Sequence, residues 1–177
     1  ADELILKSCT KLSSNEVSIA IYHDRFGFLS CHLDELNPAI VFTNKSQLNA
    51  IELNCKANNL VIENYSDPLS LLENKIELAL LKVPKSLALF ELYLQHISQN
   101  STDDVQIIIG FMTRHFSTKM IEIAEKYFNV VEQSRAVKKA LNLHEQDEIV
   151  GYLYIGTPQV ECKKLPRHKP EHYFSNL

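Results

Sequence analysis

Short apolar runs alternate with longer amphipathic segments along most of this chain. Runs rich in Val, Ile and Leu predict strands, and apolar positions that recur three or four residues apart predict helices. We expect strands at 17–22, 39–43, 60–62, 76–83, 105–111 and 130–137. We expect helices at 1–9, 28–36, 45–58, 86–99 and 117–127, and a turn or short helix at 67–73. Ser86 and Ser117 begin two of these helices, where a hydroxyl caps free backbone N–H groups.

This alternation predicts an α/β fold. Short strands separated by helices are joined by βαβ crossovers and therefore run parallel. The expected architecture is a Rossmann-like, doubly wound, mostly parallel sheet with an extended C-terminal tail. In such sheets a ligand binds beyond the carboxyl ends of the strands, so the turns that follow the strands are where chemistry is expected.

The turns at these strand ends do not have the residues of a cofactor site. Residues 21–30 read Ile-Tyr-His-Asp-Arg-Phe-Gly-Phe-Leu-Ser, with one glycine, whereas a phosphate-cradling turn uses two or three so that the backbone can approach the ligand. Residues 41–45, Val-Phe-Thr-Asn-Lys, contain no acid to hold ribose hydroxyls. Residues 81–85, Leu-Lys-Val-Pro-Lys, lack the Asn-Pro-Pro-aromatic pattern of amino-methylating enzymes. We therefore expect no cofactor and no catalytic residue in this chain.

Charge and cysteine content narrow the function classes further. The formal net charge of −4 argues against a strongly basic nucleic-acid binder, but residues 82–140 hold eight Lys and Arg against six Asp and Glu. Cys9, Cys31, Cys55 and Cys162 form no Cys-x-x-Cys pair, so buried thiols are expected rather than a zinc site or a disulfide framework. No apolar run is long enough to span a membrane and the chain starts without a basic segment, so we expect a soluble, cytoplasmic protein.

Other groupings of reactive side chains do not predict a site. His23, Asp24, His32 and Asp34 lie near the first turn, but their spacing matches no recognised metal-ligand pattern, and no metal is expected. Cys31 and His32 are adjacent on a predicted helix and point about 100° apart, so the histidine cannot serve as base to the thiol.

Residues 1–140 resemble the N-terminal domain of the G-type ribosomal RNA large-subunit guanine-N2 methyltransferases. The segment Lys-Val-Pro-Lys-Ser-Leu-Ala-Leu at 82–89 is the most distinctive part. The other matching segments are 1–3, 24–27, 29–31, 80–81, 108–110 and 138–140. The resemblance implies a duplicated methyltransferase fold whose N-terminal copy has lost cofactor binding. It places the S-adenosylmethionine site and the catalytic motifs in a C-terminal domain, and those motifs do not occur in this sequence.

The same resemblance implies that the domain helps a catalytic domain to fold and helps to present ribosomal RNA. Basic side chains near the expected strand ends could contact RNA phosphates, which supply affinity without reading sequence. The candidates are Lys82, Lys85, Arg114, Lys119, Arg135, Lys138 and Lys139. The alternative is that these are ordinary solvated surface charges.

Residues 141–177 resemble the C-terminus of an FMN-dependent nitroreductase. The match rests on Leu-Asn-Leu at 141–143 and on Glu-Ile-Val-Gly-Tyr-Leu-Tyr-Ile-Gly-Thr-Pro at 148–158. It implies a late strand and an arm that packs across a homodimer partner, whereas flavin binding carries over to no residue here. A gene fusion, a truncated reading frame and an artificial junction near Ala140 are all compatible with this change of character. Residues 149–155 could also pair as an edge strand of the sheet.

Three functions remain open at this stage. The first is RNA engagement in support of a methyltransferase domain. The second is a fragment or partner of an FMN-dependent NAD(P)H nitroreductase, with FMN as cofactor, and it rests on the tail. The third is a protein-interaction module that uses the acidic first half of the chain.

Overall fold

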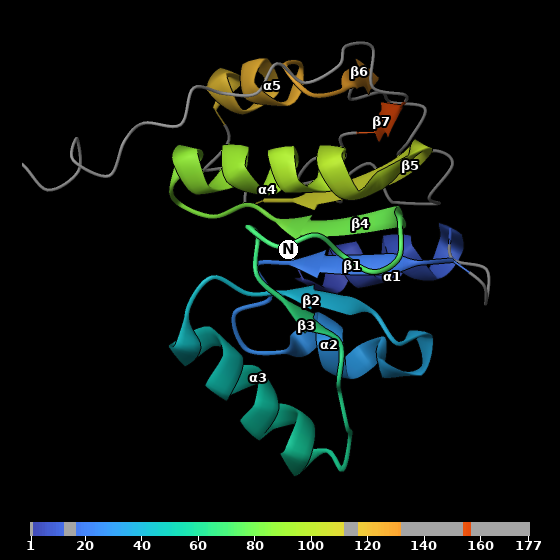
Figure 1. Ribbon diagram of the computed structural model, residues 1–177, viewed down its shortest axis with the longest axis vertical. Helices are drawn as coiled ribbons and strands as arrows, with labels where there is room; N and C mark the ends of the chain where they lie inside the picture. Colours follow the sequence, from blue (N-terminus) through green and yellow to red (C-terminus); the bar gives the residue numbers. More distant parts are fainter. Residues whose placement is uncertain (1, 13–16, 112–116, 132–153, 157–177) are drawn as a thin grey trace, which may run out of the picture.

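The computed structural model describes residues 2–12, 17–111, 117–131 and 154–156, and its centre is a five-stranded sheet. The strands follow the order β3-β2-β1-β4-β5, and every neighbouring pair is parallel. They are β1 (Ile19–Tyr22), β2 (Ala39–Val41), β3 (Tyr65–Ser66), β4 (Ile76–Lys82) and β5 (Ser101–Gly110). The predicted doubly wound α/β fold is confirmed (Figure 1).

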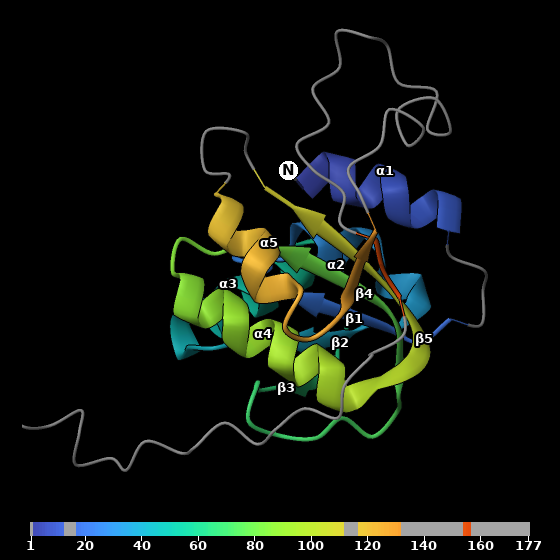
Figure 2. The ribbon, with the colours of Figure 1, turned by 90° about the horizontal axis from the view of Figure 1, so that it is seen from above.

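Helices cover both faces of this sheet, as Figures 1 and 2 show. They are α1 (Asp2–Leu12), α2 (Phe28–His32), α3 (Lys45–Ala57), α4 (Leu87–Asn100) and α5 (Thr118–Ala124), with a 3₁₀ turn at Asp34–Leu36. Alternate side chains of each strand point to opposite faces. In β1, Ala20 and Tyr22 join the apolar core under α4 and α5, and Ile19 and Ile21 join the core under α1 and α2. The strands are apolar on both sides for this reason.

The helices that follow the strands begin at side-chain caps. The Ser86 hydroxyl accepts a hydrogen bond from the Leu89 N–H at the start of α4, and Ser117 accepts one from Lys119 at the start of α5. Both caps were expected from the sequence. The side-chain Oδ1 of Asn44 caps α3 in the same way and accepts a hydrogen bond from the Gln47 N–H at 2.8 Å. Each cap satisfies a donor that would otherwise be left free in the first turn.

The prediction of a strand at 60–62 is wrong. The chain leaves α3 through Asn59, which adopts a left-handed conformation with φ of 58°. Leu60 and Ile62 then pack their side chains against the core beneath α3, and backbone pairing starts only where the Ile40 N–H donates to the Asn64 carbonyl at 2.8 Å. The apolar pattern of this segment reflects side-chain packing, and the strand itself is the short β3.

The segment between β3 and β4 is held against α4 by buried polar groups. His96 of α4 contacts the Tyr22 hydroxyl through Nδ1 at 2.9 Å and the Ser70 carbonyl through Nε2 at 2.7 Å. Because the carbonyl can only accept, Nε2 carries the proton and Nδ1 accepts from the tyrosine. The Leu72 N–H donates to Asn100 Oδ1 at 2.8 Å. This segment forms turns rather than a helix.

A second, two-stranded sheet follows α5. β6 (Asn129–Val131) pairs antiparallel with β7 (Tyr154–Gly156), and β7 also lies beside β5. The strand expected at 149–155 is thus described over its last part, where it pairs with β6 instead of joining the parallel sheet. The remainder of that strand, and residues 132–137 of the strand expected at 130–137, lie outside the described residues.

Candidate functional site

The carboxyl ends of β1, β2, β4 and β5 meet at one edge of the sheet, which we call the carboxyl edge. It comprises the residues that follow these strands and the first turns of α3, α4 and α5. This is the edge at which open parallel sheets bind ligands.

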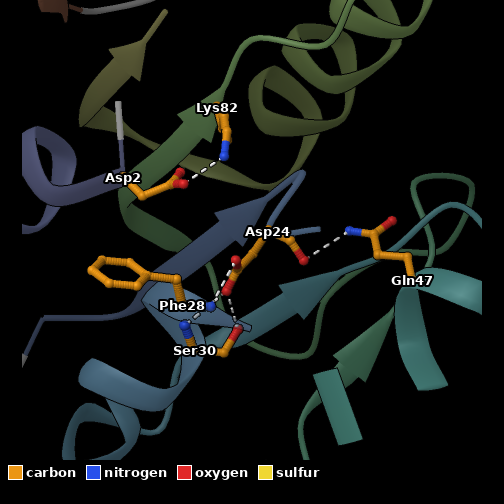
Figure 3. Close-up of polar contacts among 6 residues, drawn as sticks. All are labelled: Asp2, Asp24, Phe28, Ser30, Gln47 and Lys82. Carbon is orange, nitrogen blue, oxygen red and sulfur yellow. Dashed lines mark hydrogen bonds and ion pairs between the residues drawn. The ribbon is translucent and has the colours of Figure 1, made fainter. Parts of the chain in front are cut away.

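The turn after β1 is organised by the buried carboxylate of Asp24. Only 3% of this residue is exposed. Its Oδ1 accepts from the Phe28 N–H at 3.0 Å, and its Oδ2 accepts from the Ser30 N–H at 2.9 Å and the Ser30 hydroxyl at 2.7 Å (Figure 3). These N–H groups belong to the start of α2, where a bound phosphate would otherwise accept hydrogen bonds. The protein's own carboxylate therefore satisfies these donors.

Two residues of this turn have positive φ angles. His23 has φ of 59° and Gly27 has φ of 80°. A Cβ on Gly27 would lie 3.3 Å from the Cα of Ile51, so this glycine allows α3 to pack closely against the turn. His23 occupies a left-handed conformation that is unfavourable for a residue with a side chain. The turn thus places a histidine in a backbone conformation that glycine adopts more readily.

Charged side chains surround His23. The pKa of His23 lies below its usual value, first because the ring is partly buried and then because Arg25 and Lys82 are positive, while Asp2 acts in the opposite direction. The Nδ1 atom is buried and has no hydrogen-bond partner among the described residues. The His23 ring centroid lies 6.1 Å from that of Tyr93 in α4. A neutral imidazole is therefore the favoured form at this edge.

Gln47 links the end of β2 to the turn that follows β1. This residue is 7% exposed, and its Oε1 accepts from the Thr43 N–H at 3.1 Å. Its Nε2 donates to the Asp24 carbonyl at 3.4 Å (Figure 3). An amide thus bridges two strand ends at the place where a cofactor-binding sheet holds ribose hydroxyls on a carboxylate.

The end of β4 is covered by the start of α1. Lys82 Nζ contacts Asp2 Oδ2 at 2.5 Å, and the two side chains are 28% and 30% exposed (Figure 3). The other carboxylate oxygen, Oδ1, is buried and has no hydrogen-bond partner among the described residues. Lys82, predicted as an RNA-binding candidate, is half-buried and forms an ion pair with Asp2. Because the partner is 80 residues away, sequence spacing gave no sign of this contact.

The other predicted RNA-binding residues divide into two groups. Lys85 and Lys119 are exposed and lie at the carboxyl edge, just before α4 and in the first turn of α5. Arg114, Arg135, Lys138 and Lys139 lie outside the described residues.

Sequence reasoning missed two exposed cations at the same edge. Arg25 lies in the first turn, and Lys45 is the first residue of α3. Their positions directly after expected strands were a usable signal.

Within residues 2–12, 17–111, 117–131 and 154–156, no group of three or more His, Cys, Asp or Glu side chains could hold a metal ion. Among the helices of the same ranges, none is long and apolar enough to cross a bilayer.

The described fold is similar to that of solved methyltransferases. One is a TehB-like S-adenosylmethionine-dependent methyltransferase from Corynebacterium glutamicum, with a TM-score of 0.59 and 10% identity over 88% of this chain and 86% of that one. Another is the N-methyltransferase NodS from Bradyrhizobium japonicum, with a TM-score of 0.58 and 9% identity over 89% and 94%. At such identities the likeness concerns the fold alone.

Curated relatives share clear sequence similarity with this chain. The protein named ribosomal RNA large subunit methyltransferase G is 31% identical in Klebsiella pneumoniae subsp. pneumoniae, over 81% of this chain and 38% of the relative. In Shewanella sp. (strain W3-18-1) it is 30% identical, over 100% of this chain and 47% of the relative. The chain therefore spans less than half the length of these relatives.

The expected boundary near Ala140 stays a prediction. A family model, described as the RLMG N-terminal domain, matches residues 1–148, and the Shewanella relative aligns with the whole chain. The resemblance of residues 141–177 to a nitroreductase receives no support from these matches. Apart from 154–156, those residues lie outside the described part of the structure.

The strand ends, the fold and the sequence similarity agree on one family. The parallel sheet has the fold of methyltransferases, and Asp24 accepts hydrogen bonds at the start of α2. The family match covers most of the chain. This chain belongs to the family of RLMG N-terminal domains.

Proposed function

We propose that this chain is a non-catalytic domain of a 23S ribosomal RNA guanine-N2 methyltransferase, and that it supports RNA binding by a catalytic domain outside the chain. The observation that carries the proposal is the first turn, in which Asp24 holds the N–H groups that a cofactor would need. The names of the relatives supply the RNA substrate class. In this account, S-adenosylmethionine binds to the other domain.

Exposed cations at the carboxyl edge support a role in RNA binding. Arg25, Lys45, Lys85 and Lys119 are all exposed and all follow strands of the same parallel sheet. The amino ends of α3 and α4 point toward the same edge, on the left in Figure 1. The positive ends of helix dipoles favour nearby phosphate groups, and Lys and Arg add charge without base specificity. We assign RNA backbone contacts to this set.

Lys82 contributes less to RNA binding than the exposed set. Its ammonium group already has a carboxylate partner, and an RNA phosphate would have to displace Asp2. Phosphate contacts gain affinity by releasing counterions from the RNA, and a lysine that is already neutralised adds little to that gain. Among the predicted residues we therefore weight Lys85 above Lys82, and we add Lys45, which was not predicted.

A binding titration with matched charge controls tests the proposal. The purified chain is titrated onto protein-free large-subunit ribosomal RNA fragments at about 50 and about 200 mM salt. One variant is Lys45→Ala/Lys85→Ala at the carboxyl edge. The control is Lys56→Ala/Lys75→Ala, which removes the same charge from exposed positions at the opposite ends of α3 and β4.

The two variants separate a local site from a net-charge effect. We expect the edge variant to weaken binding and to reduce the salt slope by about 0.7 for each lysine lost, because each lost contact releases fewer counterions. The control variant should bind like the parent chain. Equal effects of both variants, or no RNA binding at low salt, would contradict an RNA role for this edge.

A further inference from the structure

Two cysteine side chains are in contact between α2 and α3. Cys31 Sγ and Cys55 Sγ are 3.4 Å apart. Each lies in the last turn of its helix, and the residues are 24 positions apart in sequence. Cys9 belongs to a different core cluster, under α1 and α2. Cys162 lies outside the described residues.

The two thiols differ in their access to solvent. Cys55 is 3% exposed and packs with Ile40 and Ile51, whereas Cys31 is half-buried at the margin of that cluster. Burial, together with the contact to Cys31, raises the pKa of Cys55 to about 12. Cys55 therefore keeps its proton, and an oxidant from solvent reaches Cys31 first.

We propose that Cys31 and Cys55 form an oxidisable pair that a hydroperoxide converts to an intrachain disulfide. The Cys31 thiol gives up its proton, and the thiolate attacks the terminal oxygen of the hydroperoxide. The O–O bond breaks, a sulfenic acid forms, and the leaving alkoxide, or hydroxide when the oxidant is hydrogen peroxide, takes up a proton. The Cys55 sulfur then attacks that sulfenic sulfur, its proton leaves with the hydroxyl group as water, and the S–S bond forms. Overall, two thiols and one hydroperoxide give one disulfide, one water and one alcohol. When the oxidant is hydrogen peroxide, a second water forms in place of the alcohol.

The surroundings favour this product over a metal site. No third His, Cys, Asp or Glu completes a metal-binding group with these thiols among the described residues. The sulfurs must approach from 3.4 Å to the bonded distance of about 2.05 Å. The disulfide would link α2, whose first N–H groups donate to Asp24, to the C-terminal end of α3.

Peptide mapping after mild oxidation tests the proposal. The folded chain is treated with hydrogen peroxide, remaining thiols are alkylated, and the digest is analysed by mass spectrometry. The test uses three forms of the protein, namely the parent chain, Cys162→Ser and Cys55→Ala. Thermal unfolding of each form is followed by circular dichroism before and after oxidation.

We expect a Cys31–Cys55 linked peptide in the parent and in Cys162→Ser, removed by dithiothreitol. Closing a loop of this length restricts the unfolded chain, so oxidation should raise the Tm by about 5–10 °C. In Cys55→Ala, oxidised Cys31 should stop at the sulfenic acid, which dimedone traps. Two outcomes overturn the proposal: both thiols stay alkylatable after oxidation, or Cys31 pairs with Cys162 in the parent.

Discussion

Removing the Asp24 carboxylate tests whether this side chain organises the first turn. The carboxylate accepts hydrogen bonds from two backbone N–H groups and one hydroxyl, at donor–acceptor distances from 2.7 to 3.0 Å. Hydrogen bonds to a charged group contribute about 1.5–3 kcal/mol each, and a buried donor without a partner costs about 1–3 kcal/mol. The Ser30 hydroxyl can rotate to another acceptor, so the two N–H groups determine most of the loss.

We therefore expect Asp24→Ala to lower the free energy of unfolding by about 3–5 kcal/mol. Asp24→Asn keeps one acceptor and places an NH₂ group near Ser30, so about half of that loss is expected. Glu35→Ala is the matched control, because Glu35 is an exposed carboxylate in the 3₁₀ turn that follows α2. Its effect should stay within about 0.5 kcal/mol.

Urea unfolding followed by circular dichroism measures these differences. For a chain of this size, a loss of about 3–5 kcal/mol corresponds to a fall in Tm of roughly 6–20 °C. A loss below about 1 kcal/mol for Asp24→Ala would refute the reasoning. It would mean that water satisfies these donors as well as the carboxylate does, and that the turn is open to a ligand.

Two further predictions concern titration and backbone conformation. Burial lowers the pKa of both His23 and His96. Just below about pH 6.5 the unfolded chain therefore binds protons that the folded chain does not. The free energy of unfolding should be at its full value above about pH 6.5 and should fall as the pH drops below it. Urea titrations between about pH 7.5 and 5.5 measure how the free energy of unfolding changes with pH. The variant His96→Gln should show a weaker dependence on pH. An unchanged dependence would mean that His96 does not contribute to it. Gly27→Ala should cost about 1–3 kcal/mol, because φ is 80° and the new Cβ would lie 3.3 Å from the Ile51 Cα. The same urea assay checks this value, and a neutral result would show that α3 can move away from the turn.

The sequence predicted the parallel architecture because local and tertiary preferences agree in most elements. The segment at 76–83 is largely apolar and forms the interior strand β4, between β1 and β5. Serine caps marked the starts of α4 and α5. The error at 60–62 arose because partly buried side chains of a loop give the same pattern as a short strand.

The site was only partly predictable, because its main contacts join residues that are distant in sequence. The single glycine predicts a turn without a phosphate cradle, and that stays a prediction; nothing in the sequence indicated that Asp24 would hold the start of α2. Neither the ion pair of Asp2 with Lys82 nor the contact of Cys31 with Cys55 follows any local spacing rule. Both depend on how helices pack on the sheet.

A calorimetric titration of S-adenosylmethionine into the 177-residue chain tests the central claim most directly. The same preparation is first shown to be folded by circular dichroism, so that a negative result has a defined meaning. The account predicts no binding heat up to millimolar cofactor, because the protein's own carboxylate and amide occupy the first two strand ends. Saturable binding in the micromolar range would contradict it and would place a working cofactor site in this domain.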